Sequence, residues 1–183
     1  MRVISGKLKG RNLKGYDIDG TRPTMARVKE SVFASIQDKV SGSVVLDLFA
    51  GSGNLGIEAI SNGASRCFFV DSNRECIKVI NENVKMFHIE KECVVLEKDY
   101  HDALNYFNKN DIQFDIIFID PPYKYVVMNE ILGIIMEYSL LKENGIIVFE
   151  YQKEEQVDAS ISLELVRNKK YGDKFVSIFS LIK

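Results

Sequence analysis

Residues 44–56, with the sequence VVLDLFAGSGNLG, decide the fold of this chain. The segment begins with an apolar run of strand type, passes through three glycines and continues into a helical stretch that we expect over residues 54–62, with Gly63 ending it. The glycines are Gly51, Gly53 and Gly56. Their G-x-G-x-x-G spacing, in strand–loop–helix order, is typical of α/β domains that bind a nucleotide or nucleoside.

Strands and helices alternate along the chain on both sides of the glycine loop. Apolar runs of strand type occupy residues 44–48, 66–70, 93–97, 114–119 and 146–150. Helical patterns separate them at residues 73–86, after His101 and within residues 126–139. Uninterrupted apolar strands that alternate with helices indicate a parallel sheet covered on both faces. The sequence therefore predicts an α/β fold with a doubly wound, mostly parallel sheet, whose ligand lies at the carboxyl ends of the strands.

The C-terminal part of the chain departs from this alternation. Residues 163–171 and 175–182 are strand-like and follow one another without a helix between them. Gly172 and Asp173 separate the two segments and are typical of a tight turn. This pattern predicts an antiparallel hairpin that brings the sheet to seven strands.

The N-terminal part is a small β/α extension. Short extended pieces punctuated by glycines lead into Arg22-Pro23-Thr24 and then into an amphipathic helix. We expect Thr24 to cap this helix, because its hydroxyl can accept a hydrogen bond from a free backbone N–H. Residues 1–40 are predicted to form a hairpin and helix packed on a core domain of residues 41–183.

Three aspartates are predicted to stand at the C-terminal ends of the first three strands, beside the glycine loop. They are Asp47, Asp71 and Asp99. Asp71 is placed to accept both ribose hydroxyls of a nucleoside, and Asp99, with Tyr100 beside it, the adenine amino group. A dinucleotide would bring its pyrophosphate against Asp47, whereas S-adenosylmethionine (SAM) offers an ammonium group that this carboxylate can pair with. The aspartates favour SAM, and an NAD-binding oxidoreductase is the alternative.

A rigid turn follows the fourth strand, with the sequence Asp120-Pro121-Pro122-Tyr123. Two prolines remove backbone donors and fix the turn, so the Asp120 carboxylate and the Pro121 carbonyl can face the crevice as acceptors. Two acceptors on the N–H groups of an exocyclic base amine would aim its lone pair at a methyl donor and stabilise developing positive charge. The Tyr123 ring could stack on the base. We predict that these four residues are catalytic.

Length and composition exclude several classes of protein. The chain has 183 residues, 46% of them hydrophobic and 27% charged, with a mean hydropathy of −0.07, which suits one globular domain. No apolar run approaches the roughly 20 residues that span a bilayer, and no signal peptide is evident. Three cysteines and two histidines, without metal-ligand spacing, predict reduced thiols, no metal site and a cytoplasmic protein.

Charge is unevenly distributed along the chain. Residues 1–29 carry eight lysines and arginines against two aspartates, a net charge of +6, so the remainder carries −8 of the total of −2. A basic arm on an acidic body suggests a polyanionic partner. A merely solvated, lysine-rich surface explains the same distribution equally well.

These motifs together resemble a known family, the bacterial 16S ribosomal RNA (guanine-N2)-methyltransferases of the RsmD type, within the class I SAM-dependent methyltransferases of Rossmann-like fold. The resemblance rests on segments in matching order over essentially the whole chain. They are MRVISGK at residues 1–7, Arg22-Pro23-Thr24 with RVKE at 27–30, LDLFAGSG at 46–53, Asp120 to Tyr123, and Lys170-Tyr171-Gly172. Asn54 and Lys174 depart from the family pattern, where a small residue and a threonine are more usual.

The resemblance implies roles for individual residues. The SAM-binding residues would be Asp47, Phe49, Ala50, Gly51, Ser52, Gly53, Asp71, Ser72, Asp99, Tyr100 and Asp120. Asp120, Pro121, Pro122 and Tyr123 would hold the guanine N2 amine. The substrate-binding residues would be Arg22, Pro23 and Thr24, which close over the site, and Arg2, Lys7, Lys9 and Arg11, which meet RNA. The implied partner is 16S ribosomal RNA in the assembled or assembling small subunit, bound by a monomer.

Other readings share part of this evidence. The tetrapeptide also suits transfer to a DNA adenine or cytosine, or to a protein glutamine amide. A non-catalytic RNA-binding assembly factor could retain the fold, although the intact tetrapeptide argues against it.

Overall fold

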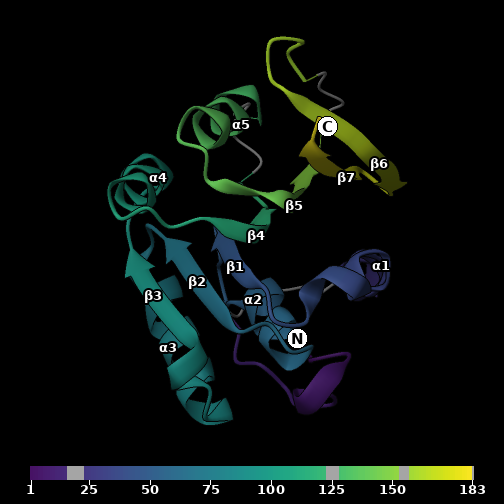
Figure 1. The fold of residues 1–183 in the computed structure, drawn as a ribbon. Helices are drawn as coiled ribbons and strands as arrows, with labels where there is room; N and C mark the ends of the chain where they lie inside the picture. The colour runs from purple at the N-terminus through teal and green to yellow at the C-terminus, as the bar shows by residue number, and fades with distance from the viewer. Residues whose placement is uncertain (16–22, 123–127, 153–156, 183) are drawn as a thin grey trace.

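Seven strands form one mixed sheet in the described part of the chain, which comprises residues 1–15, 23–122, 128–152 and 157–182 of a computed structural model (Figure 1). The strands are β1 (Val44–Leu48), β2 (Arg66–Asp71), β3 (Cys93–Glu97), β4 (Phe114–Ile119), β5 (Leu141–Tyr151), β6 (Leu163–Tyr171) and β7 (Lys174–Leu181). Their order across the sheet is β3-β2-β1-β4-β5-β7-β6. Strands β1 to β5 are parallel, and β7 runs antiparallel to both β5 and β6. The predicted doubly wound sheet with an antiparallel C-terminal hairpin is confirmed.

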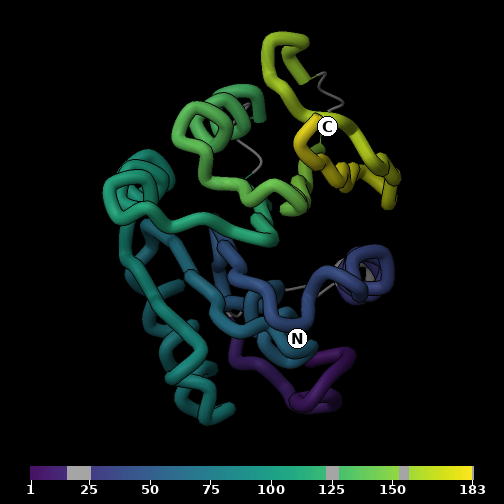
Figure 2. Tube along the Cα trace, in the orientation of Figure 1, coloured from purple at the N-terminus to yellow at the C-terminus, as the bar shows by residue number. Residues whose placement is uncertain are grey.

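Helices cover both faces of the sheet, as the trace in Figure 2 shows. They are α1 (Pro23–Val40), α2 (Asn54–Ser61), α3 (Arg74–Phe87), α4 (Tyr100–Lys109) and α5 (Met128–Glu137), with short 3-10 turns η1 (Gly6–Leu8) and η2 (Glu90–Glu92). Apolar side chains of α1, α2 and α3 pack on one face, and those of α4 and α5 pack on the other. Among the described helices, none is both long and apolar enough to cross a membrane.

Most predicted boundaries agree with the structure to within one residue, and three predictions do not hold. β5 begins five residues earlier than expected, because Leu141 pairs with Phe114 before a register shift. The helix expected after His101 begins at Tyr100, because the Asp99 side chain caps it. The expected cap at Thr24 is wrong, since α1 already begins at Pro23. Proline suits a first helical position because that position needs no backbone N–H donor.

The N-terminal segment packs against the same core as the helices that follow it. Val3, Leu8 and Leu13 are buried in one apolar cluster with side chains of α1, α2 and α3. Arg2 and Asn12 form an antiparallel bridge, and the Val3 N–H donates to the Arg11 carbonyl at 2.9 Å. The first residues therefore form a hairpin closed by η1, docked along α2.

The strand order places a crevice at the carboxyl ends of the parallel strands. β1 is paired with β2 on one side and with β4 on the other, so the chain reverses its winding at β1. In open α/β sheets, ligands bind at such a switch point.

Candidate active site

A cavity of about 810 Å³ opens at the switch point. Its walls come from the glycine loop after β1, the end of β2, the start of α4 and the exit of β4. This volume lies within the range of roughly 300–1,000 Å³ that is usual for small-molecule sites. Among the predicted SAM-binding residues that the structure describes, all but Gly53 line the cavity.

The glycine loop is held by its own backbone and by β2. The N–H groups of Phe49 and Ala50 both donate to the Val70 carbonyl, at 3.1 and 2.9 Å. Phe49 has a φ of +104°, a conformation that costs a non-glycine residue of the order of 1–3 kcal/mol and that clusters at functional sites. Gly51 has a φ of +56°, and a Cβ atom there would meet no protein atom within 4 Å. Gly51 therefore presents bare backbone to the open cavity.

The other two glycines serve packing. Gly53 has a φ of +79° and precedes α2, and a Cβ atom there would lie 3.3 Å from both Ile57 and Phe69. At Gly56 a Cβ atom would lie 2.3 Å from the Phe69 ring and 2.6 Å from the Cys67 sulfur. The motif thus splits into one glycine that faces the cavity and two that bring α2 close to the sheet.

Asp47 and Asp71 lie at the base of the glycine loop. Asp47 is 4% exposed, and its Oδ2 accepts a hydrogen bond from the Gly56 N–H at 2.9 Å. Burial raises the pKa of Asp47 to about 7, a net value that includes the opposing Gly56 hydrogen bond and a smaller upward effect of the negative charge of Asp71. Within the described residues Oδ1 of Asp47 accepts no hydrogen bond. It is a buried acceptor on the cavity wall, suited to a cationic ligand group.

Asp71 fixes the backbone around the loop as well as facing the cavity. Its Oδ2 accepts from the Gly51 N–H at 2.9 Å, and its Oδ1 accepts from the Asn73 N–H at 2.8 Å. Each carboxylate oxygen retains a second lone pair for a ligand hydroxyl.

The sequence suggested that Asp99 ends β3. In the structure Asp99 stands two residues beyond β3, as the cap of α4. Its Oδ1 accepts from the Asp102 N–H at 3.0 Å, and this hydrogen bond lowers the pKa of Asp99. The exposed carboxylate still lines the cavity.

Aromatic rings line the cavity next to Asp99. The rings of Phe49 and Tyr100 lie 5.5 Å apart, and Tyr100 stacks on His101 at 4.0 Å. The Tyr100 hydroxyl donates to Glu130 Oε1 at 3.0 Å, and His101 Nε2 lies 2.6 Å from the same oxygen. Glu130 thereby joins α5 to the start of α4. From the sequence, His101 was expected only not to bind a metal, and the structure places it on the cavity wall.

The exit of β4 forms the wall opposite the glycine loop. Asp120, Pro121 and Pro122 all line the cavity, whereas Tyr123 lies outside the described residues. Burial raises the pKa of Asp120 to about 7, and the negative charge of Glu150 adds to the shift. Glu150, on β5, forms an ion pair with Lys174. The positive charge of Lys174 lowers the pKa of Asp120 and so offsets part of the shift. Asp120 therefore exchanges its proton near neutral pH.

Comparison with known proteins places this geometry in a family. A family model described as "Conserved hypothetical protein 95" matches residues 1–180. "Putative rRNA methyltransferase YlbH" of Bacillus subtilis is 42% identical over 180 residues, 98% of each chain. "Ribosomal RNA small subunit methyltransferase D" of Haemophilus influenzae is 30% identical over 94% of this chain and 89% of its own. This chain belongs to the RsmD family.

A solved structure has the same fold over almost the whole of both chains. "Putative methyltransferase yhhF from Escherichia coli" has a TM-score of 0.85 to this RsmD family member at 26% identity, covering 99% of this chain and 97% of that one. The Rossmann-like methyltransferase fold expected from the sequence is confirmed.

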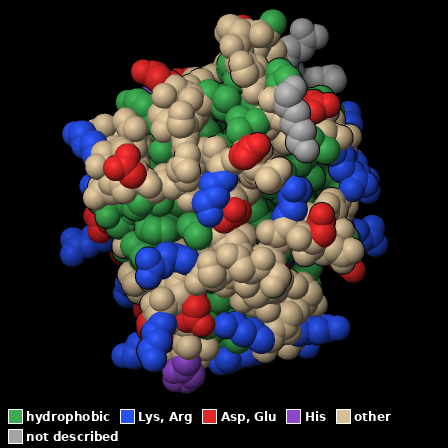
Figure 3. Space-filling view, in the orientation of Figure 1, with side chains coloured by type: hydrophobic (Ala, Val, Ile, Leu, Met, Phe, Trp, Pro, Cys, Tyr) green, Lys and Arg blue, Asp and Glu red, His purple; other side chains and the backbone are tan. Residues whose placement is uncertain are grey.

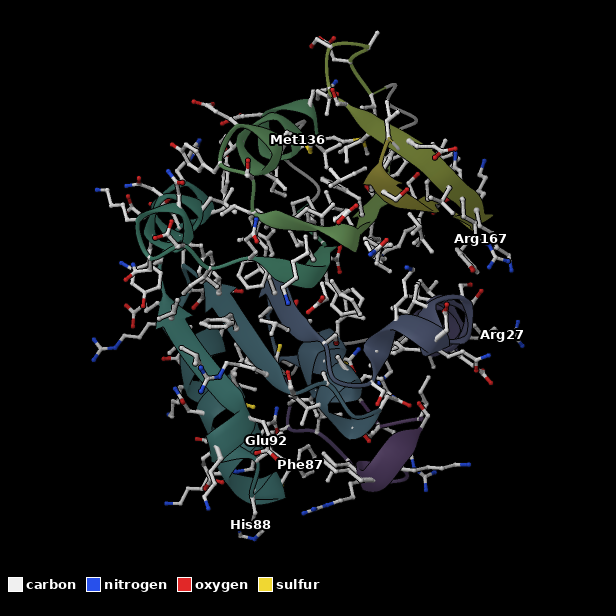
Figure 4. The ribbon with its side chains drawn as sticks, in the orientation of Figure 1. Arg27, Phe87, His88, Glu92, Met136 and Arg167 are labelled. Atoms are coloured by element: carbon white, nitrogen blue, oxygen red, sulfur yellow. The ribbon has the colours of Figure 1, made fainter. Side chains whose placement is uncertain are left out.

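Two of the basic residues predicted to bind substrate, Lys7 and Arg11, do not line the cavity in this RsmD family member. Lys7 pairs with Glu92 at 3.2 Å, and the Arg11 guanidinium donates to the Met86 carbonyl. Figure 4 shows Glu92 at the lower end of the molecule, beside the N-terminal hairpin. The eight residues of α2, about 12 Å in length, separate η1 from the cavity, because α2 contacts the cavity at its first residue and η1 at its last.

The remaining predicted substrate residues are only partly described. Arg2 and Lys9 are exposed on the hairpin. Pro23 and Thr24 form the first turn of α1, and Arg22 lies outside the described residues.

A buried ion pair that was not predicted from the sequence lies next to the cavity of this RsmD family member. Lys29 Nζ lies 2.7 Å from Glu58 Oε2, with side chains 4% and 0% exposed. Lys29 also donates to the Arg2 carbonyl and to Asn54 Oδ1, both at 2.8 Å. Glu58 accepts from the Ser5 N–H at 2.8 Å. The departure at Asn54 is thus explained, because its amide oxygen completes this cluster at the edge of the cavity.

Asn83 is a second residue that sequence reasoning missed. It is fully buried on α3, and its side chain accepts from the Lys14 N–H at 2.8 Å. The same side chain donates to the Ser52 carbonyl at 3.1 Å. It therefore ties the end of the hairpin to the glycine loop. A lone asparagine on the apolar face of a helix was the available signal.

Proposed function

We propose that this chain transfers a methyl group from SAM to the exocyclic N2 amine of a guanine in 16S ribosomal RNA of the small subunit. One observation carries the proposal: a single cavity brings the glycine loop and Asp47 together with the Asp120-Pro121-Pro122 exit of β4. The names of the relatives support ribosomal RNA as the acceptor.

The residues present fit SAM. The backbone of Gly51 leaves open the space that a Cβ atom would fill. The free Oδ1 of buried Asp47 suits the ammonium group of the methionine moiety, and pairing with a cation would hold this carboxylate ionised. Asp71 would accept from the ribose hydroxyls, and Asp99 from the adenine amine beside the Phe49–Tyr100 wall. When bound, SAM supplies a methyl group on a positively charged sulfur.

Asp120 and the Pro121 carbonyl would hold the guanine amine. An exocyclic amine is a weak nucleophile because its lone pair is delocalised into the ring. Hydrogen bonds from its two N–H groups to fixed acceptors orient the nitrogen and stabilise positive charge as it develops. Only the ionised form of Asp120 is a full acceptor, so its raised pKa makes this function sensitive to pH near 7.

The target guanine must leave its stack to reach Asp120, because Asp120 lines a cavity that a base within a stacked helix cannot enter. Extruding a nucleotide costs a few kcal/mol, which contacts elsewhere on the RNA must offset. We expect Tyr123 to stack on the extruded base and Arg22-Pro23-Thr24 to close over it.

The experiment is methyl transfer from labelled SAM to four acceptors: small ribosomal subunits from a strain that lacks the gene, naked 16S rRNA, DNA and total protein. We expect label in the subunits or the rRNA, and a monomethylated guanine at N2 on mass spectrometry of the digested rRNA. Label confined to DNA or protein would contradict the acceptor. Calorimetric binding of NAD in place of SAM would contradict the cofactor.

A further inference from the structure

Much of the charge on the N-terminal arm is neutralised within the protein. Lys7, Lys14 and Lys29 lie 3.2, 3.0 and 2.7 Å from carboxylate oxygens of Glu92, Glu82 and Glu58. Lys29 is in addition buried. The net charge of +6 in residues 1–29 therefore overstates what this arm offers to RNA.

The edge strand β6 carries cations that are not neutralised in this way. Residues 164–170 are all exposed and include Arg167, Lys169 and Lys170. Lys169 lies 5.0 Å from the centre of the Tyr171 ring, and Lys170 lies 5.3 Å from that of Phe175. Across the described residues, none of the three cations forms an ion pair with a carboxylate.

Helix α1 extends this basic surface. Ser31 and Ser35 both contact β6, the first through the Tyr171 hydroxyl and the second through the Arg167 guanidinium. Arg27 lies one turn before Ser31, and positions four residues apart share one face of a helix. Figure 4 shows Arg27 and Arg167 on the same flank of the molecule, and Figure 3 shows Lys and Arg side chains along that flank. Lys170 pairs with Phe175, which packs on the opposite face of the sheet, so we call only Arg27, Arg167 and Lys169 the α1–β6 surface.

The α1–β6 surface lies at the same edge of the sheet as Asp120. β6 runs parallel to β5, because both are antiparallel to β7, so the C-terminal end of β6 meets the carboxyl ends of the parallel strands. Tyr171 pairs with Lys174, whose ammonium group contacts Glu150 beside Asp120. Three strand spacings separate β6 from β4, a distance of roughly 14 Å. The first turns of α1 also lie near the cavity, since Lys29 contacts cavity-lining Asn54.

We propose that the α1–β6 surface binds backbone phosphates of the RNA next to the extruded nucleotide. The inference rests on the proposed function for the identity of the RNA. Arginine and lysine contacts to phosphates position a nucleic acid without reading its sequence, which is what an enzyme that selects a folded RNA requires. Acidic neighbours Glu30, Glu164 and Asp173 border the surface and limit its extent.

The test compares two triple variants that each remove three positive charges. R27Q/R167Q/K169Q alters the α1–β6 surface, and K78Q/K91Q/K109Q alters exposed lysines on α3, η2 and α4 as the matched control. Binding to in vitro transcribed 16S rRNA is measured over a series of salt concentrations. The first variant should bind about tenfold or more weakly, with a salt slope lower by about 0.7–0.9 for each phosphate contact removed, and the control should match wild type. SAM affinity should be unchanged in both.

The outcomes separate this proposal from the proposed function. Equal rRNA binding by R27Q/R167Q/K169Q and wild type overturns the α1–β6 surface, even if wild type methylates rRNA. An equal loss in the control variant overturns it too, because the effect would then be one of overall charge. A selective loss in R27Q/R167Q/K169Q supports the surface even if wild type transfers no methyl group to rRNA, in which case only the proposed function fails.

Discussion

Replacing Lys29 with methionine removes the cation from a cluster that has almost no access to water. Glu58 is fully buried and would remain as a carboxylate without its partner. The substitution also removes the hydrogen bonds that Lys29 Nζ donates to the Arg2 carbonyl and to Asn54 Oδ1. Burial lowers the pKa of Lys29 and Glu58 opposes that shift, so the carboxylate is what keeps this ammonium group charged inside the protein.

The expected loss is about 3–5 kcal/mol in the free energy of unfolding, the usual effect of removing one partner of a buried ion pair. For a chain of this length it corresponds to a fall in Tm of roughly 6–20 °C. K142M is the matched control, because Lys142 lies 2.7 Å from Asp115 with side chains 39% and 35% exposed. This pair is partly exposed to solvent, and solvated pairs contribute about 0–1 kcal/mol, so K142M should lose much less stability than K29M.

Urea unfolding followed by circular dichroism measures both variants. The double variant K29M/E58Q should recover part of the loss, because glutamine removes the stranded charge and keeps an acceptor for the Ser5 N–H. A loss in K29M no greater than that in K142M would refute the reasoning.

Three further predictions concern the site. G51A should weaken SAM binding at least about tenfold in calorimetry while costing only about 1–2 kcal/mol of stability, because its Cβ projects into the cavity from a left-handed backbone; unchanged SAM affinity would contradict the position of the cofactor. G56A should lose roughly 1–3 kcal/mol in urea unfolding, since its Cβ would lie 2.3 Å from the buried Phe69 ring, and a neutral effect would contradict the packing role. Turnover should rise with pH through about 7, as Asp120 loses its proton, and this limb should vanish in D120N; a limb that persists would belong to another group, such as Asp47.

The sheet could be predicted from the sequence because its signals are local. Strands β3, β4 and β6 have the predicted boundaries, since each is a short run between clear turn or helix signals. The cavity followed from topology, because parallel strands bring their carboxyl ends to one edge.

The pairing of charges could not be predicted, because the partners are far apart in the sequence. Glu92 lies 85 residues from Lys7, and Glu82 lies 68 residues from Lys14, so a count of charges over residues 1–29 could not show that they are neutralised. Lys29 gave a usable signal, since it stands four residues before buried Phe33 on the apolar face of its helix. A single charge on such a face predicts a buried partner.

The measurement that tests the central claim most directly is single-turnover methyl transfer by D120A, with SAM affinity measured on the same preparation. We expect SAM to bind within about threefold of wild type and methyl transfer to fall by about 100-fold or more, as for the loss of a preorganised catalytic group. D120A that transfers the methyl group as fast as wild type would contradict the role of Asp120 and, with it, the active site described above.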